Sequence, residues 1–563
     1  MMTTFENKQQ VKLLALSKDQ NGSGSSNLPS YRYIEFLNVH GNKCRLFIES
    51  KLTTSLPKLK DFLVENNFPP NEVDLHGKEI KGILAADTAR YFYFVMKPGY
   101  AGNGYINGDG TFIGKERRES KKCIGNYLYP KANFQEPNQS QSGTLEGWKK
   151  YVASRAKYSP PLMLSLCAAL SGYILHFADV ESGGFHFHGD SSIGKSTCLK
   201  FAASVCGGSD YINSWLTTET AFEEMAAGHS DSTLILDELN LLDKDPKVAA
   251  QRAMKLVYGA TSGQGKKRSR AYDDGSISWR VSLLSSGESS LSEHAHTGGR
   301  EQNKGEAVRL VDVSADVGND FGIYEKLPKR CKGCSAVMAD RTNRACDKNY
   351  GTAKDVFIDY LLTHISPKGD AMKLRRHIST FMKHFLAAHS AYNLSGQRLR
   401  IAKRFALAYA AGALAVKAEV LPFSNDEVMH GISTCFKESI EKQPLSMGQL
   451  VTQAKKELGE YLLKALDSSS FYKDLSAEEA KQTPYYRTSI KNHEVLALKS
   501  QSLHEFVSDD EVRKVLLKEC VKKGILLPSR DKKPTRQPPS GKSGVVLSRR
   551  YCFLIDELNK LTS

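Results

Sequence analysis

The segment from Gly189 to Thr197 constrains this chain more than any other stretch. It reads GDSSIGKST and follows the β-rich residues 185–188. Glycines in such a loop let backbone N–H groups close around a phosphate, and a helix that starts after them adds its positive dipole end. The preceding strand and the helix-compatible residues 197–205 are the context that this motif requires. The sequence therefore predicts a nucleotide-binding phosphate loop.

The residue types of this loop fit ATP and Mg²⁺. Lys195 is expected to reach the β- and γ-phosphates, and the Ser196 hydroxyl is expected to ligate Mg²⁺. The residues expected to contact the nucleotide are Gly189, Asp190, Ser191, Ser192, Ile193, Gly194, Lys195, Ser196 and Thr197.

A second half of an ATPase site follows about forty residues later. Residues 232–236 form an apolar run that ends in Asp237 and Glu238. Asp237 is expected to hold Mg²⁺, and Glu238 is expected to polarise the attacking water. In isolation this pattern favours a buried strand with acidic surface residues. When the pattern follows a phosphate loop in the sequence, it favours catalytic roles for the two acidic residues.

Two further predicted strands carry polar side chains to this site. Residues 280–284 deliver Ser286 to the carboxyl edge of the sheet, where ligands bind and where a polar group can sense the γ-phosphate. Arg309 lies near the start of the segment 308–313, beside a predicted strand. It is either an ion-pair residue at the edge of the core or an arginine finger that reaches the nucleotide of a neighbouring subunit.

A basic segment lies between the acidic strand and the sensor strand. Its cations surround a predicted hairpin tip, and they are Lys266, Lys267, Arg268 and Arg270. Such a hairpin can grip a nucleic-acid backbone, or it can be an ordinary solvated turn. The residues alone leave both interpretations open.

Composition limits the class of protein. With 563 residues the chain is expected to form two to four domains, and its net charge of +16 suits a polyanionic partner or solvated lysines. Eleven scattered cysteines indicate reduced thiols in the cytoplasm. Residues 161–177 form an apolar run just short of a comfortable membrane span, and we interpret it as a buried helix.

Composition shifts divide the chain into five parts. The expected fold class is α/β, with a P-loop NTPase core. The parts are a disordered tail (1–30), an α/β N-terminal domain (31–145), the ATPase core (146–350), a helical lid region (351–443) and a winged-helix-like C-terminal module (444–563). In the last part an amphipathic helix (510–523) precedes a predicted hairpin, in which a basic loop (530–542) joins residues 525–527 to residues 544–555. This pattern serves DNA or protein contacts.

Candidate metal ligands are few. Cys331 and Cys334 have the spacing of zinc ligands, with Cys346 nearby, but no second pair completes four ligands. Whether they bind zinc stays open. His186 and His188 alternate along the strand before the phosphate loop, and we interpret them as satisfied core histidines.

The motifs in their order resemble a bacterial family of unknown function whose members are often described as helicases and include the Cch helicases of staphylococcal cassette chromosomes. The resemblance rests on GFHFHGDSSIGKST, STLILDEL, SGQGKKRSRAYDDGSISWRVSLLSSGES and GEAVRLVDV, and it extends from about residue 33 to about residue 437.

The resemblance implies an AAA+-like ATPase akin to the MCM and superfamily 3 helicases, assembled as a hexameric ring on the DNA of a mobile element or prophage. It implies that Lys195 and Ser196 form the Walker A pair, Asp237 and Glu238 the Walker B pair, Ser286 sensor 1, and Arg309 the finger given in trans. The basic hairpin becomes an element of a pore around single-stranded DNA, and a separate primase or initiator is an expected partner. The alternative function is a nucleotide-switched assembly on DNA, such as an initiator or defence ATPase, without unwinding.

Overall fold

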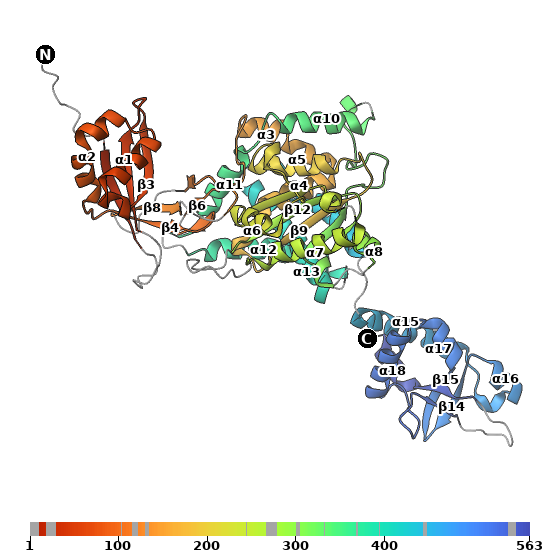
Figure 1. Ribbon diagram of the computed structural model, residues 1–563. Coiled ribbons are helices and arrows are strands. Elements are labelled where there is room, and N and C mark those ends of the chain that lie inside the picture. Colours follow the sequence, from red (N-terminus) through yellow and green to blue (C-terminus); the bar gives the residue numbers. More distant parts are fainter. Residues whose placement is uncertain are drawn as a thin grey trace, which may run out of the picture. The chain divides into compact units, whose positions relative to one another are not determined.

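The computed structural model describes residues 11–18, 30–102, 104–114, 122–129, 134–243, 245–265, 278–299, 304–331, 333–366, 370–392, 394–442, 447–538 and 548–562. They form a mixed α/β protein (Figure 1) with two compact units, Met1–Lys442 and Gln443–Ser563. Each unit contains hydrophobic clusters of its own.

The N-terminal sheet has the strand order β3-β2-β1-β4-β8. Its central strand β1 corrects the prediction of a disordered tail over residues 1–30. The residues VKLLALS form a seven-residue strand that pairs with β2 and β4. The strand was not predicted because polar residues flank it on both sides. The bounds are β1 (Val11–Ser17), β2 (Tyr31–Leu37), β3 (Lys43–Glu49), β4 (Tyr91–Val95) and β8 (Cys123–Leu128), with helices α1 (Leu56–Glu65) and α2 (Pro70–Ala85).

A small three-stranded sheet follows and packs on the part of the chain that contains the central sheet. Its strands are β5 (Gly99–Ala101), β6 (Gly104–Ile106) and β7 (Phe112–Ile113). The Tyr100 hydroxyl donates to the carbonyl of Tyr173 (2.8 Å), and the Tyr105 hydroxyl donates to the carbonyl of Asp231 (3.3 Å). The glycine-rich segment at 98–110 therefore packs on the core and does not form a separate loop.

The central sheet is parallel throughout and has the order β10-β11-β12-β9-β13. All five carboxyl ends therefore lie at one edge. The strand that carries Ser286 lies between the strand before the phosphate loop and the strand that ends in Asp237. The bounds are β9 (Gly183–His188), β10 (Asn213–Ser214), β11 (Ser232–Asp237), β12 (Val281–Gly287) and β13 (Leu310–Ser314).

Helices cover both faces of this sheet because successive strand residues alternate between two hydrophobic clusters. Ile235 and Leu284 belong to the cluster formed with α4, α5, α13 and α14, whereas Leu234 and Leu283 belong to the cluster formed with α6 and α7. Figure 1 shows helices such as α4, α6 and α7 around this sheet. The helix bounds are α3 (Leu145–Tyr151), α4 (Pro160–Ser171), α5 (Lys195–Cys206), α6 (Glu219–Gly228), α7 (Pro246–Ser262), α8 (Leu291–Thr297), α9 (Lys304–Ala307), α10 (Ser335–Cys346), α11 (Thr352–Leu362), α12 (Met372–Ala388), α13 (Gly396–Lys417) and α14 (Asn425–Glu441).

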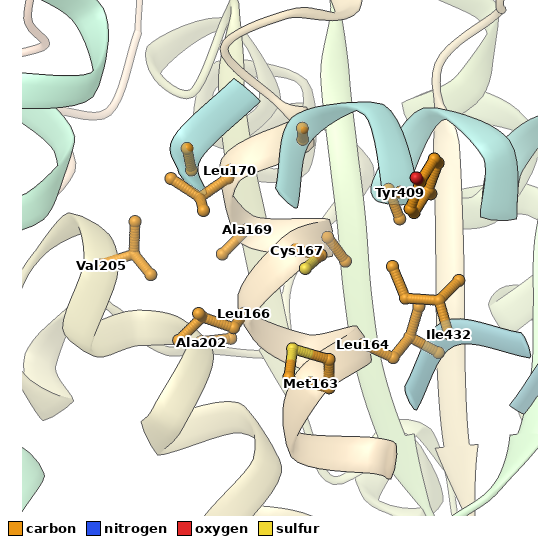
Figure 2. Close-up of a cluster of buried hydrophobic side chains, with 14 of the residues drawn as sticks. Met163, Leu164, Leu166, Cys167, Ala169, Leu170, Ala202, Val205, Tyr409 and Ile432 are labelled. Atoms are coloured by element: carbon orange, nitrogen blue, oxygen red, sulfur yellow. The ribbon is translucent and has the colours of Figure 1, made fainter. Parts of the chain in front are cut away.

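Helix α4 contains most of the apolar run at 161–177, which is just short of the length of a membrane span. Every one of its twelve residues is buried. Figure 2 shows Met163, Leu166 and Leu170 of α4 among side chains of neighbouring helices such as Ala202 and Ile432. The interpretation as a buried helix is confirmed. Within the residue ranges that the structure describes, no helix is long and apolar enough to cross a membrane.

The C-terminal unit is a four-stranded sheet, in the order β14-β15-β17-β16, with helices. All its strand pairs are antiparallel. The bounds are α15 (Met447–Ser468), α16 (Ala477–Gln482), β14 (Tyr485–Ile490), β15 (His493–Lys499), α17 (Ser500–Phe506), α18 (Asp510–Lys522), β16 (Thr535–Arg536) and β17 (Arg550–Leu554). The expected pairing across the basic loop is present as an antiparallel bridge between Leu526 and Phe553. The pairing of β16 with β17 and the β14–β15 hairpin were not predicted.

Candidate nucleotide site

The phosphate loop has the backbone geometry that only glycine tolerates at two positions. Gly189 has φ of 140° and Gly194 has φ of 111°. A Cβ atom on Gly189 would lie 2.4 Å from Cδ1 of Ile193, and one on Gly194 would lie 2.9 Å from Cδ1 of Ile323. Helix α5 begins directly after Gly194, and no side chain caps its first N–H groups. These N–H groups are suited to bind an anion.

The Lys195 ammonium lies inside this loop. Its Nζ donates to the carbonyls of Gly189 (2.8 Å) and Asp190 (2.6 Å). Partial burial lowers the pKa of Lys195, and the carboxylates of Glu288, Asp190 and Asp237 oppose this shift. The lysine is therefore electrostatically coupled to the carboxyl ends of β11 and β12.

The register of the parallel strands explains why three distant segments meet here. In β12, Ser286 pairs with Phe187 of β9, two residues before the loop. Ser285 pairs with Leu236 of β11, so that Ser286 lies beside Asp237. The Ser286 hydroxyl donates to Oδ1 of Asp237. The structure thus brings together Lys195, Asp237 and Ser286, which the sequence predicted as one site.

Glu238 has an unusual backbone conformation. Its φ and ψ are 62° and 61°, in the left-handed region that non-glycine residues seldom adopt. Its N–H donates to Oδ1 of Asp237 (3.0 Å), and its side chain is exposed. Residues held in this region cluster at functional sites because the strain orients a side chain. In this protein it turns Glu238 off the strand and leaves its carboxylate in solvent beside Asp237.

A buried polar network supports β12 from behind. The Ser285 hydroxyl lies 2.9 Å from Nε1 of Trp215 and 2.9 Å from Nδ1 of His186, and Nε2 of His186 lies 3.1 Å from the carbonyl of Ser289. Burial lowers the pKa of His186 to about 3. His186 is therefore a neutral, satisfied core residue, as interpreted from the sequence. The part played by Trp215 was missed, because no spacing in the sequence relates it to Ser285.

Two acidic residues near the site were also missed. Asp312 of β13 accepts the N–H of Leu291 (2.8 Å), and burial raises its pKa to about 7. Glu438 of α14 accepts the N–H of Ser314 at the carboxyl end of β13 (3.2 Å). The last turns of α14 therefore contact the edge that carries the phosphate loop. The sequence indicated only that Asp312 lies in the predicted strand at 308–313, and it gave no signal for the contact of Glu438.

Arg309 lies at the opposite edge of the sheet. It directly precedes β13, and its guanidinium stacks on the ring of Tyr258 (4.5 Å to the centroid) and donates to the carbonyl of Gly305 (2.7 Å). The strand β13 separates it from the phosphate-loop edge by about 16 Å at ~3.3 Å per residue. Arg309 is therefore not part of the nucleotide site of its own chain.

The predicted DNA-binding cations lie outside the described residues. Lys266, Lys267, Arg268 and Arg270 fall in the range 266–277. The flanking residues are described: Gln264 and Ser278 form an antiparallel bridge. The chain before and after the range is thus paired, directly before β12.

A cavity of about 420 Å³ lies near the phosphate loop. Its lining includes Tyr158, Ser159, Met163 and His430. Ile323 connects it to the loop, since the Ile323 N–H donates to the carbonyl of Ile193 (3.2 Å) and the Ser159 hydroxyl donates to the carbonyl of Ile323.

The donor groups fit ATP and Mg²⁺. Uncapped N–H groups, a lysine and left-handed glycines suit a triphosphate, and the Ser196 hydroxyl and Asp237 carboxylate are the hard oxygen ligands that Mg²⁺ prefers. By contrast, the described side chains contain no group of three or more His, Cys, Asp or Glu that could hold a metal. Cys331 and Cys346 are buried and Cys334 is exposed, and all eleven cysteines are free.

Comparison with known proteins shows likeness to a family model and to a solved structure. Residues 31–277 match the family model described as domain of unknown function DUF927. No curated protein matches. The solved structure described as "SCCmec type IV Cch - active helicase" is similar, with a TM-score of 0.55 and 14% sequence identity over 98% of this chain and 95% of that chain. The chain therefore shares the fold of that helicase over nearly its whole length.

Proposed function

We propose that this protein is an ATP-dependent DNA helicase or translocase of a mobile element or prophage, active as a ring. The observation that carries the proposal is the meeting of Lys195, Asp237, Glu238 and Ser286 at one edge of a parallel sheet, beside a glycine loop that opens a helix. The likeness to a structure described as an active helicase supports DNA as the partner.

Each group has a defined task in ATP hydrolysis. Lys195 and the first N–H groups of α5 bind the phosphate oxygens and neutralise their charge. Ser196 and Asp237 would hold Mg²⁺, which supplies further positive charge between the phosphates. Glu238 accepts a proton from the attacking water as the new P–O bond forms and the bond to ADP breaks.

The surrounding residues position these groups. The Ser286 hydroxyl donates a hydrogen bond to Oδ1 of Asp237 and so orients this carboxylate. We place the adenine base of ATP in the cavity lined by Tyr158 and His430. Ile323 lies between this cavity and the phosphate loop, because it is hydrogen-bonded both to Ser159 in the cavity lining and to Ile193 of the loop. The parallel order, with β12 between β9 and β11, supports an AAA+-like core.

The proposed coupling to DNA uses residues at other places. The basic hairpin at 266–270 would grip one strand in a central pore. Arg309, at the far edge of the sheet, would stabilise transition-state charge at the site of a neighbouring subunit. Hexamer formation, single-stranded DNA in the pore and a separate primase or initiator belong to this proposal.

Steady-state ATP hydrolysis with and without single-stranded DNA tests the proposal. We expect DNA to stimulate turnover, and we expect added salt to weaken that stimulation. Lys195→Ala should abolish turnover by weakening nucleotide binding, whereas Glu238→Gln should bind ATP and not turn it over. Near-normal turnover by Glu238→Gln would show that another group activates the water. Turnover that ignores DNA would favour the nucleotide-switched assembly instead.

A further inference from the structure

Half of the net charge of the protein is concentrated in one short segment. Residues 522–550 contain nine basic side chains and one acidic side chain, Asp531, whereas the whole chain carries +16. The segment lies in the C-terminal unit, far along the chain from the nucleotide site. The function proposed above assigns it no task.

The fold gathers these cations at one edge of the C-terminal sheet. Ser529 and Lys533 close a tight turn, in which the Ser529 N–H donates to the carbonyl of Lys533 (2.8 Å). The edge strand β16 follows and pairs with β17, and the Arg549 guanidinium donates to the carbonyl of Thr535 in β16 (2.7 Å). We call this set the basic rim, which consists of Arg530, Lys532, Lys533, Arg536 and Arg549.

The basic rim carries an excess of positive charge, since Asp531 is the one acidic residue in its turn. Of its five members all but Arg536 are exposed, and none forms an ion pair with another residue that the structure describes. Some other cations of the same unit are paired, such as Lys514 with Glu511 and Lys560 with Glu557. Like charges held on one turn and one edge strand repel one another, and an external anion would relieve that repulsion.

The start of helix α18 is a poor candidate for the same anion. Helix α18 begins with Asp510 and Glu511, and the side chain of Asp509 already accepts the N–H groups of its first turn. The positive end of this helix dipole is therefore neutralised. Contact through the start of α18 would place two carboxylates against phosphate, so the basic rim is the favoured surface.

We propose that the basic rim binds the phosphate backbone of duplex DNA without reading its sequence. Within the described residues the rim offers lysines and arginines but no aromatic side chain on which an unpaired base could stack, so single-stranded binding is disfavoured. A duplex presents one charge per about 1.7 Å and matches a row of cations. The choice of DNA over RNA rests on the proposed function. In the proposed helicase, the rim holds the duplex while ATP hydrolysis moves the basic hairpins at 266–270 along one strand.

Binding by the full-length protein tests this proposal. The rim variant combines Arg530→Gln, Lys532→Gln and Lys533→Gln. The matched control combines Lys456→Gln, Lys464→Gln and Lys481→Gln, which removes three exposed positive charges from α15 and α16 of the same unit. The affinity for a blunt duplex of roughly 30 base pairs is measured without ATP as salt is raised from about 50 to about 200 mM, and duplex RNA and single-stranded DNA of equal length are run in parallel.

We expect the rim variant to bind duplex DNA roughly tenfold or more weakly, with a log–log salt slope smaller by about 2 to 3, whereas the control binds like the parent. Equal affinity and equal slope in rim variant and parent would overturn the proposal. So would a loss of affinity in the rim variant that is as large for duplex RNA or single-stranded DNA as for duplex DNA. ATP turnover without DNA should be unchanged in the rim variant, so failure of the rim proposal is distinguishable from failure of the ATPase assignment.

Discussion

Ser286 is the residue whose contact is most informative about the site, because its hydroxyl binds the carboxylate proposed to hold Mg²⁺. In Ser286→Ala, Asp237 keeps only the N–H of Glu238 as a described donor to Oδ1. We expect the kcat of ATP hydrolysis to fall about 10- to 100-fold, the usual cost of losing a supporting partner. The KM for ATP should change less. Ser292→Ala, at an exposed position of α8, is the control and should keep the parent kcat.

His186 gives a pH dependence of stability that can be isolated by one substitution. Its pKa is about 3 in the folded protein and about 6.5 when unfolded. Below pH 6.5 the unfolded state therefore binds a proton that the folded state does not, and stability falls as the pH falls. At about pH 5 the loss is about 2 kcal/mol for this one group.

His186→Asn removes that group. We expect the difference in unfolding free energy between parent and variant to shrink by about 2 kcal/mol when denaturant titrations at about pH 7 and about pH 5 are compared. His40→Asn changes an exposed turn residue and should give a constant difference. A constant difference for His186→Asn as well would mean that its ring is hydrated and not buried.

At the residue scale the sequence predicted the members of the site better than their environment. Lys195, Asp237 and Ser286 each follow or end a predicted strand, and parallel strands bring their carboxyl ends together. The contacts of Trp215 and Glu438 were not predictable, since they depend on how β10 and α14 pack against the sheet. The left-handed backbone conformation of Glu238 was likewise not predictable from the residue types around it.

At the element scale, the β14–β15 hairpin was not predicted because its turn has an unusual sequence. Lys491 and Asn492 connect the strands, with φ of 50° and 63°. Two-residue hairpin turns of this kind need positive φ at both positions and favour Asn-Gly. Lysine seldom adopts that conformation, so the turn lacks its usual signature. The alternation in YYRTSI and HEVLALK was the remaining signal.

The same turn can be improved by substitution. Lys491→Asn combined with Asn492→Gly places preferred residues at both left-handed positions, and we expect the local stability of the hairpin to rise by about 0.5 to 1 kcal/mol. Amide hydrogen exchange in β14 and β15 measures it. Asn492→Ala is the opposite control and should speed exchange. Slower exchange with alanine would contradict the left-handed backbone conformation of Asn492.

Strand β1 shows the other limit of prediction at this scale. Its VKLLALS pattern does not alternate cleanly, and it stands between polar residues that suit a disordered tail. The strand is stable because β2 and β4 pair with it on both sides. Neighbours in space, and not local residue types, decide such an element.

At the scale of the whole molecule, the position of Arg309 makes its role a question about assembly. The arginine and the phosphate loop lie at opposite edges of one sheet, so Arg309 can complete a nucleotide site only in a second copy of the chain. If it acts as a finger, Arg309→Ala alone should lower kcat about 10³-fold or more without loss of ATP binding. The matched control is Arg400→Ala, which removes an exposed arginine from α13 and should keep the parent kcat.

Mixing two inactive variants separates this role from a structural one. Lys195→Ala subunits keep Arg309, and Arg309→Ala subunits keep Lys195, so a mixed ring contains some interfaces with both groups intact. With equal amounts mixed at random, turnover should recover to about one quarter of the parent rate, because about one interface in four combines the intact groups. If Arg309 only holds Tyr258 and the chain before β13, its loss damages its own subunit and the mixture stays inactive. Recovery therefore requires contact between subunits through this edge of the sheet.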